Sequence, residues 1–104
     1  MIVEHIGVSA LLEQLAEECC ELAQASLKMA RKLRDENPTP KSIEDIRDNL
    51  VEEIADVNVC VSTLCDETNV VDAEEMNVVS LHKKLRWKKR LEQHLGIDYN
   101  ELFK

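Results

Sequence analysis

Residues that reverse the direction of the chain are scarce: the 104 residues include only two glycines and two prolines. Only three residues are aromatic, although aromatic side chains are among those that favour strands. A β-sandwich or barrel needs a turn signal about every 8–12 residues, and this sequence does not supply them. We therefore predict an all-α protein of three to four helices. The length suits one small domain, which we place at residues 1–104.

The first predicted helix begins at Ser9, because Ser9 and the following Glu13 resemble an N-terminal capping pattern ahead of an apolar repeat. It runs to about Asp35, and basic residues fill its last turns, where they complement the helix dipole. Residues 36–41 (ENPTPK) end it, because a residue that precedes proline is disfavoured in the α conformation. We expect this segment to be an extended connector.

Two further capping patterns predict two further helices. Ser42, which stands ahead of two acidic residues, starts a helix that continues to about Thr68. Asp72, with a glutamate three residues later, starts a third helix that ends before Gly96, a residue type favoured just after a helix C-terminus. The tail, residues 97–104, is short and shows no clear pattern.

Apolar residues recur at helical spacing in the first two predicted helices and mark the faces that should pack together. They are Leu11, Leu15, Leu22, Met29 and Leu33 in the first helix, and Ile46, Leu50, Ile54, Val57 and Leu64 in the second. At about 100° per residue, Glu18 and Glu21 project inside or at the edge of the first face. Glu53 and Asp56 take the same positions beside the second face. If the two faces pack against each other, four carboxylates meet.

A carboxylate removed from water is costly unless it is paired or binds a metal, and four converging carboxylates repel one another. The first predicted helix has no Lys or Arg before Lys28, and the second has none after Arg47. A hard divalent cation is therefore the better partner, and Mg²⁺ is commonly held by carboxylates together with substrate phosphates. Glutamates at this spacing are also common on plain helix surfaces, so a solvated acidic face stays open as the alternative.

The charge balance bears on partners and location. The formal charge is −8, from 21 acidic against 13 basic residues, which excludes a protein that coats nucleic acid through general basicity. No apolar run approaches the roughly 18 residues of a membrane span, and no secretion signal opens the chain. We expect a cytoplasmic protein without membrane contact. The four cysteines, which we expect to be buried and reduced, are Cys19, Cys20, Cys60 and Cys65.

The acidic pairs lie in motifs that resemble a known family. Residues 17–22 (EECCEL) and 52–57 (EEIADV) look like the EExxE and EExxD signature of MazG-like all-α nucleotide pyrophosphohydrolases. The resemblance covers about residues 12–90, and it implies a helical bundle completed by oligomerisation. It also implies that Glu18, Glu21, Glu53 and Asp56 coordinate Mg²⁺, with Mn²⁺ as an alternative, and form the catalytic centre. The implied reaction hydrolyses a nucleoside triphosphate between its α and β phosphates, giving the monophosphate and pyrophosphate.

Basic residues supply candidate phosphate ligands. Residues 83–90 (KKLRWKKR) hold six of the thirteen basic residues, and relatives in this family often carry Lys and Arg at the comparable place. Lys83, Arg86 and Arg90 share one helix face by their spacing, and Lys28 follows the first acidic pair on its own helix. The alternative is that these residues only complement helix dipoles or lie in solvent.

Three further residues have two open interpretations each. Glu17 and Glu52 could orient or deprotonate the attacking water, or they could be solvent-facing helix residues. Trp87 could stack on a base, or it could belong to a core or an interface. No histidine motif and no nucleophile with a recognisable base supports covalent catalysis.

Two other functions remain open for the whole chain. One is a non-catalytic helical oligomer with a regulatory or adaptor role, and the other is the same fold acting on a phosphoribosyl nucleotide or an alarmone. In every case a chain with so small a core should self-associate, and we expect a homodimer or a homotetramer.

Overall fold

The computed structural model describes residues 1–36 and 40–96, and these residues form three α-helices and no strand. The helices are α1 (Ile2–Leu33), α2 (Ile43–Glu67) and α3 (Ala73–Leu95). The prediction of an all-α protein of three to four helices is therefore confirmed for the described part of the chain, which contains three. The middle of the predicted connector, residues 37–39, and the predicted tail, residues 97–104, lie outside the described residues.

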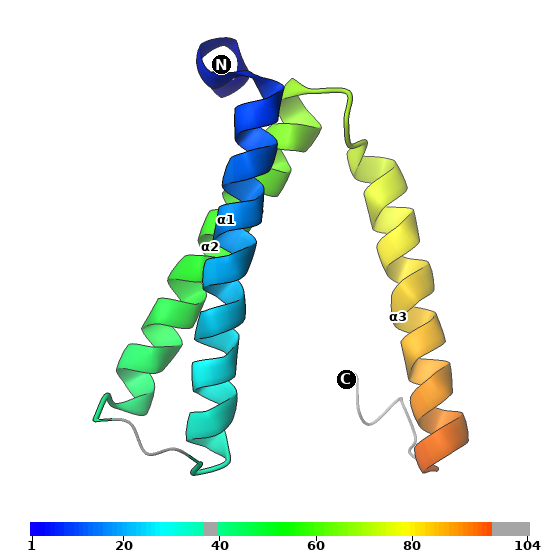
Figure 1. Ribbon diagram of the computed structural model, residues 1–104. Coiled ribbons are helices and arrows are strands. Elements are labelled where there is room, and N and C mark those ends of the chain that lie inside the picture. The colour runs from blue at the N-terminus through cyan, green and yellow to red at the C-terminus, as the bar shows by residue number, and fades with distance from the viewer. Residues whose placement is uncertain (37–39, 97–104) are drawn as a thin grey trace. The chain divides into compact units, whose positions relative to one another are not determined.

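The chain divides into two compact units, Met1–Val70 and Val71–Lys104. In the first unit, α1 and α2 pack side by side and run in opposite directions, as the colours in Figure 1 show. The second unit is built on α3. The prediction of one domain over residues 1–104 stays a prediction.

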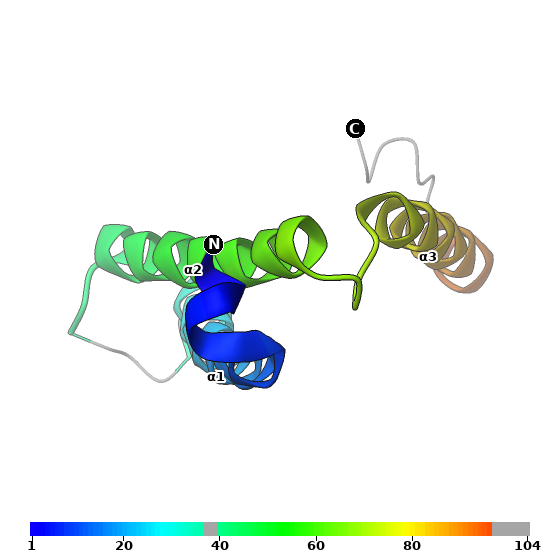
Figure 2. The same ribbon diagram turned by 90° about the horizontal axis from the view of Figure 1, so that it is seen from above.

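The start of α1 differs from the prediction, because the helix begins at Ile2 and Ser9 lies inside it. Gly7 interrupts the helix with φ 83° and ψ 162°, a conformation that is essentially reserved for glycine. The first turn is thereby set at an angle to the rest of α1 and reaches toward α2 (Figure 2). There the Val3 amide donates a hydrogen bond to Oε1 of Glu67 at 3.0 Å.

The end of α1 lies two residues before the predicted end, and Asp35 lies outside the helix. Asp35 has φ 56°, the left-handed conformation that asparagine and aspartate adopt more readily than most residues. The amide of Glu36 donates to the carbonyl of Arg31 at 2.9 Å, and the amide of Asp35 donates to the carbonyl of Lys32 at 3.2 Å. These two bonds form a Schellman motif, which satisfies the last carbonyls of the helix.

The caps of α2 and α3 confirm the predicted boundaries. Ser42 Oγ accepts from the amide of Asp45 at 3.2 Å, and a carboxylate oxygen of Asp72 accepts from the amide of Glu75 at 2.9 Å. Thr68 is the C-cap of α2, and Gly96 is the C-cap of α3, where it adopts the left-handed conformation with φ 63°.

The core lies between α1 and α2. The buried residues among those described are Leu11, Ala25, Ile46, Cys60, Thr63 and Leu64. Leu33 and Ile54, which we predicted to be on the packed faces, are 69% and 51% exposed. Leu33 is the last residue of its helix. Ile54 projects about 80° away from the direction shared by the buried Ile46 and Leu64. The packed face of α2 is centred near that direction, which Glu53 shares and Ile54 does not.

Candidate metal centre

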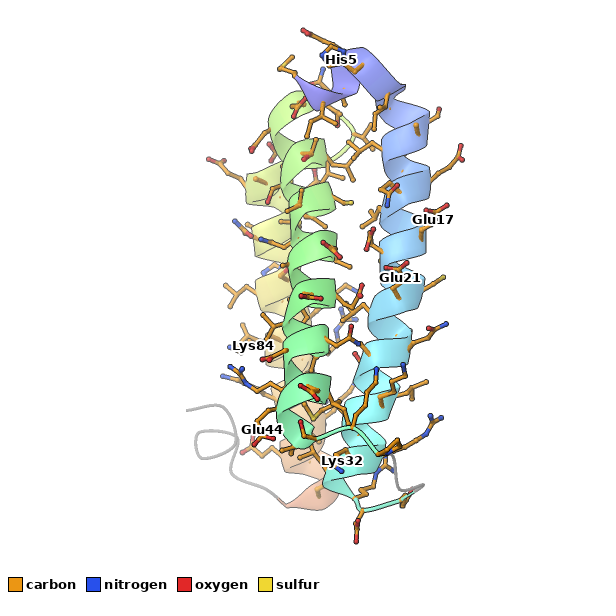
Figure 3. All side chains as sticks on the ribbon, turned by 90° about the vertical axis from the view of Figure 1, so that its left-hand side faces the viewer. His5, Glu17, Glu21, Lys32, Glu44 and Lys84 are labelled. Atoms are coloured by element: carbon orange, nitrogen blue, oxygen red, sulfur yellow. The ribbon has the colours of Figure 1, made fainter. Side chains whose placement is uncertain are left out.

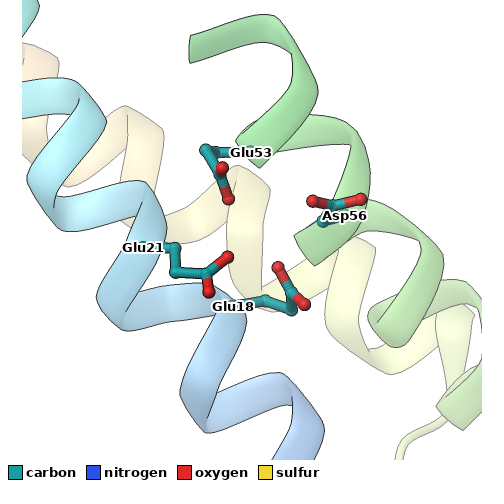
Figure 4. A group of neighbouring side chains, drawn as sticks. All are labelled: Glu18, Glu21, Glu53 and Asp56. Atoms are coloured by element: carbon teal, nitrogen blue, oxygen red, sulfur yellow. The ribbon is translucent and has the colours of Figure 1, made fainter. Parts of the chain in front are cut away.

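The middle of the α1/α2 pair brings four carboxylates together. Glu18 and Glu21 extend from α1, Glu53 and Asp56 extend from α2, and all four point toward one another (Figure 4). One ligand oxygen from each residue lies within 4.8 Å of the others. The sequence spacing explains why the two acids of each helix lie together, because residues three apart share a helix face. The packing of α1 against α2 brings the two pairs together.

Two of the four acids occupy positions that a core residue would normally fill. Glu18 stands seven residues after the buried Leu11 and seven before the buried Ala25. Glu53 stands in the same way between the buried Ile46 and Cys60. A spacing of seven returns to nearly the same helix direction. Both glutamates therefore project in the direction of the core residues. For Glu18 this agrees with the prediction of a position inside or at the edge of the apolar face, whereas Glu53 lies closer to the core direction than the position beside the face that we expected.

Burial divides the cluster into an inner and an outer pair. Glu18 and Glu53 are partly buried, whereas Glu21 and Asp56 are exposed. Oε2 of Glu18 and Oε2 of Glu53 are both buried without a hydrogen-bond partner. Leaving a buried carboxylate oxygen unsatisfied costs free energy, and a bound cation would remove that cost. These two oxygens are the positions in the cluster at which a cation could bind.

The close approach of the carboxylates also affects the pKa values of groups in and beside the cluster. The amide of Gln14 donates a hydrogen bond to Glu18 and by itself lowers the pKa of that carboxyl. Desolvation and the charges of Glu21 and Asp56 outweigh it, so that the pKa of Glu18 is raised above its ordinary value. Burial, followed by the charges of Glu18 and Asp56, also raises the pKa of the Cys60 thiol. The thiol beside the cluster therefore favours its neutral form, and the carboxylates are the candidate ligands.

The size of the cluster suits one divalent ion. Mg²⁺ binds oxygen at about 2.1 Å, so two ligands on opposite sides of one ion lie about 4.2 Å apart. The separations in the cluster, up to 4.8 Å, come within a small side-chain adjustment of that value. Oxygen donors only, from carboxylates on two rigid helices, are the set that hard cations prefer.

The other predicted site residues lie outside the cluster. Lys28 is exposed on α1, seven residues beyond Glu21, which corresponds to about 10 Å along the helix axis. Lys83, Arg86 and Arg90 are exposed on α3 and belong to the second unit. Their position beside a bound phosphate stays a prediction.

The structure shows the exposure of the three residues that had two open interpretations, Glu17, Glu52 and Trp87. Glu17 is exposed and projects from the side of α1 that faces away from α2 (Figure 3). Glu52 is also exposed, and neither residue belongs to the carboxylate cluster. Trp87 is 59% exposed on α3, so it is no core residue of its own unit.

The structure corrects one prediction about cysteines and adds one residue that the sequence analysis missed. Cys60 is buried and Cys65 partly buried, but Cys19 and Cys20 are exposed. They follow Glu18 directly, and each residue turns the helix by about 100° away from the packed face.

The residue that the sequence analysis missed is Gln14, whose Nε2 donates to Oε1 of Glu18 at 2.7 Å. Its spacing of four residues from Glu18 was a signal for this contact.

Comparison of the chain with protein-family models, with curated proteins and with solved structures finds no match in any of the three. Within residues 1–36 and 40–96, none of the helices combines the length and the apolar character needed to cross a membrane.

Proposed function

We propose that the chain is a Mg²⁺-dependent nucleoside triphosphate pyrophosphohydrolase that produces the nucleoside monophosphate and pyrophosphate. The observation that carries this proposal is the convergence of four carboxylate oxygens within 4.8 Å, contributed by an ExxE pair and an ExxD pair on two antiparallel helices. The same four residues are those that the MazG-like signature implies as metal ligands.

In this proposal Glu18 and Glu53 hold the ion from inside the helix pair, and Glu21 and Asp56 hold it from the solvent side. When bound, Mg²⁺ would supply positive charge that stabilises the negative charge developing on the phosphates and would make water more acidic. Water attacks the α-phosphorus and forms a new P–O bond, and the proton that it loses passes to solvent. The bond to the bridging oxygen breaks, and its electron pair leaves with pyrophosphate. Mn²⁺ has the same ligand preference and should substitute.

The net charge of the site requires further cations. Four carboxylates and a triphosphate are all anionic, so one divalent ion leaves a negative excess that repels the substrate. Lys83, Arg86 and Arg90 on α3, with Lys28 on α1, are the groups that we propose for the phosphates. Arginine suits this role because its guanidinium can donate two parallel hydrogen bonds to phosphate oxygens.

Hydrolysis in ¹⁸O-labelled water tests the reaction directly. Purified protein with Mg²⁺ is incubated with ribo- and deoxyribonucleoside triphosphates, and the products are separated by ion-exchange chromatography and analysed by mass spectrometry. The proposal requires monophosphate and pyrophosphate, with the label in the monophosphate because water attacks the α-phosphorus. Release of orthophosphate, label in pyrophosphate, or no turnover with either Mg²⁺ or Mn²⁺ would refute it.

Two additional substrates separate the proposal from its alternatives. Turnover of a phosphoribosyl nucleotide or an alarmone, without turnover of triphosphates, would keep the metal centre and change the substrate. Metal binding without turnover of any of these compounds would favour a non-catalytic helical oligomer.

We also propose that the chain is a homodimer or homotetramer. Only five apolar side chains are buried among the described residues, whereas seventeen large hydrophobic side chains are exposed. In the α1/α2 unit these include Leu27, Val51, Ile54 and Val59, each at least 50% exposed. Burial of such side chains against a second copy would add to a core that is small for a stable domain. Light scattering coupled to size-exclusion chromatography should give two or four times the chain mass of 11.9 kDa, and a monomer at micromolar concentration would contradict this.

A further inference from the structure

The two oxygens of Glu18 have different surroundings. Oε1 accepts a 2.7 Å hydrogen bond from Nε2 of Gln14, which lies one turn earlier on α1. Oε2 is buried and has no hydrogen-bond partner. The bond to Gln14 therefore uses one acceptor site of Oε1 and restricts the rotation of the carboxylate, while Oε2 accepts no hydrogen bond.

The chemistry of Gln14 suits this task. A primary amide donates a hydrogen bond but carries no charge, so it orients Glu18 without neutralising it. A lysine or arginine at the same place would pair with the carboxylate and compete with a cation. Carboxylates that bind metals are commonly held by such outer hydrogen bonds, which fix the orientation of the ligand.

On the opposite helix, Oε2 of Glu53 is likewise buried and has no hydrogen-bond partner among the described residues. Glu53 extends from α2 toward the same centre as Glu18 and Glu21 of α1 (Figure 4). A fixed Glu18 thus provides one defined ligand direction toward which the other three carboxylates can adjust.

We infer that Gln14 is a positioning residue for the metal centre: it holds Oε1 of Glu18 so that Glu18 binds the cation through Oε2 alone. This inference rests on the proposed function, because it presupposes that the cluster binds a divalent ion. It adds a residue that lies outside the acidic motif and is exposed on the surface of α1.

The test replaces Gln14 by methionine, which has a similar length and flexibility but no donor. Mn²⁺ binding is measured by electron paramagnetic resonance, and the Mg²⁺ concentration for half-maximal turnover is measured separately from the rate at saturating Mg²⁺. We expect Q14M to bind Mn²⁺ about 10-fold more weakly, since outer hydrogen bonds to metal ligands contribute about 10–100-fold to affinity. The Mg²⁺ requirement should rise by the same factor, and the rate at saturating Mg²⁺ should change less.

Two further variants separate positioning from folding. Q93M makes the same change at an exposed residue of α3 and should keep the wild-type Mn²⁺ affinity. Gln14→Asn keeps the amide but shortens the side chain by one methylene, so it should weaken Mn²⁺ binding as Q14M does. In the presence of EDTA, all three variants should unfold at the wild-type temperature.

The outcomes distinguish this inference from the function on which it rests. If the wild-type protein binds Mn²⁺ and Q14M binds it equally well, the role of Gln14 is refuted and the metal centre stands. If Q14M loses affinity only in proportion to a loss of stability in EDTA, Gln14 is structural and the inference is wrong. If the wild-type protein binds no Mn²⁺, both the metal centre and the role of Gln14 are refuted.

Discussion

Replacing Glu53 by glutamine tests the central feature of the structure. Glu53 occupies the middle of the packed face of α2, and its Oε2 is buried without a partner beside three other carboxylates. Glutamine keeps the shape and removes one negative charge from a cluster in which ligand oxygens lie within 4.8 Å of one another. In EDTA the variant should therefore unfold at the wild-type temperature or above it, because repulsion within the cluster falls.

Added metal should reverse the order of stability. At a free Mn²⁺ concentration of about 100 times the dissociation constant, binding to the folded state adds about 2.7 kcal/mol to the free energy of unfolding. For a domain of this size that is about 11–22 °C in Tm. If loss of an inner ligand weakens binding about 100-fold, the same Mn²⁺ concentration only equals the dissociation constant of E53Q. The gain is then about 0.4 kcal/mol, or about 2–3 °C.

Thermal unfolding followed by circular dichroism, with EDTA and with Mn²⁺, measures both effects in the same samples. Glu52→Gln is the matched control for metal affinity, because it removes the same charge from an exposed neighbour outside the cluster. It should show the full Mn²⁺ shift. An E53Q protein that Mn²⁺ stabilises as much as the wild type would refute our assignment of Glu53 as a ligand, and an E53Q protein unfolded in EDTA would show that Glu53 is needed for the fold.

Two further predictions concern the kink of α1 and the basic face of α3. Gly7→Ala should lower the free energy of unfolding by about 1–3 kcal/mol, because alanine is strained at φ 83° and ψ 162°; an unchanged urea midpoint at the same protein concentration would contradict this. Arg86→Ala should raise KM for the triphosphate about 10-fold by removing a charge-assisted hydrogen bond, while the Mn²⁺ affinity stays unchanged. An unchanged KM would remove Arg86 from the proposed phosphate ligands.

Local signals in the sequence were sufficient to predict where α2 and α3 begin and where α3 ends. Ser42, Asp72 and Gly96 act within one turn of the chain, and the structure has them in the predicted capping positions. The ends of α1 were not predictable in the same way. Its start depends on the bend at Gly7, which sets the first turn at an angle to the rest of α1, and its end depends on a left-handed aspartate where glycine is the usual residue.

The candidate site was predictable within each helix. A spacing of three residues places Glu18 beside Glu21, and Glu53 beside Asp56, in any α-helix. Spacings of seven residues, from Leu11 to Glu18 and from Ile46 to Glu53, were also present in the sequence. They indicate that the inner glutamates share a direction with core residues, but only if the neighbouring positions are known to be buried.

The tertiary structure decided which face is covered and how the two helices align. Periodicity defines a broad apolar arc, but the partner helix covers only part of it, which left Ile54 exposed and Glu53 at the centre of the contact. The alignment of α1 against α2 then brought the two acidic pairs to the same level. The sequence by itself thus determined the helices and the acidic pairs on them, because these follow from local geometry. Only the packing of α1 on α2 joined the pairs into one cluster, because no local interaction fixes the register between two helices.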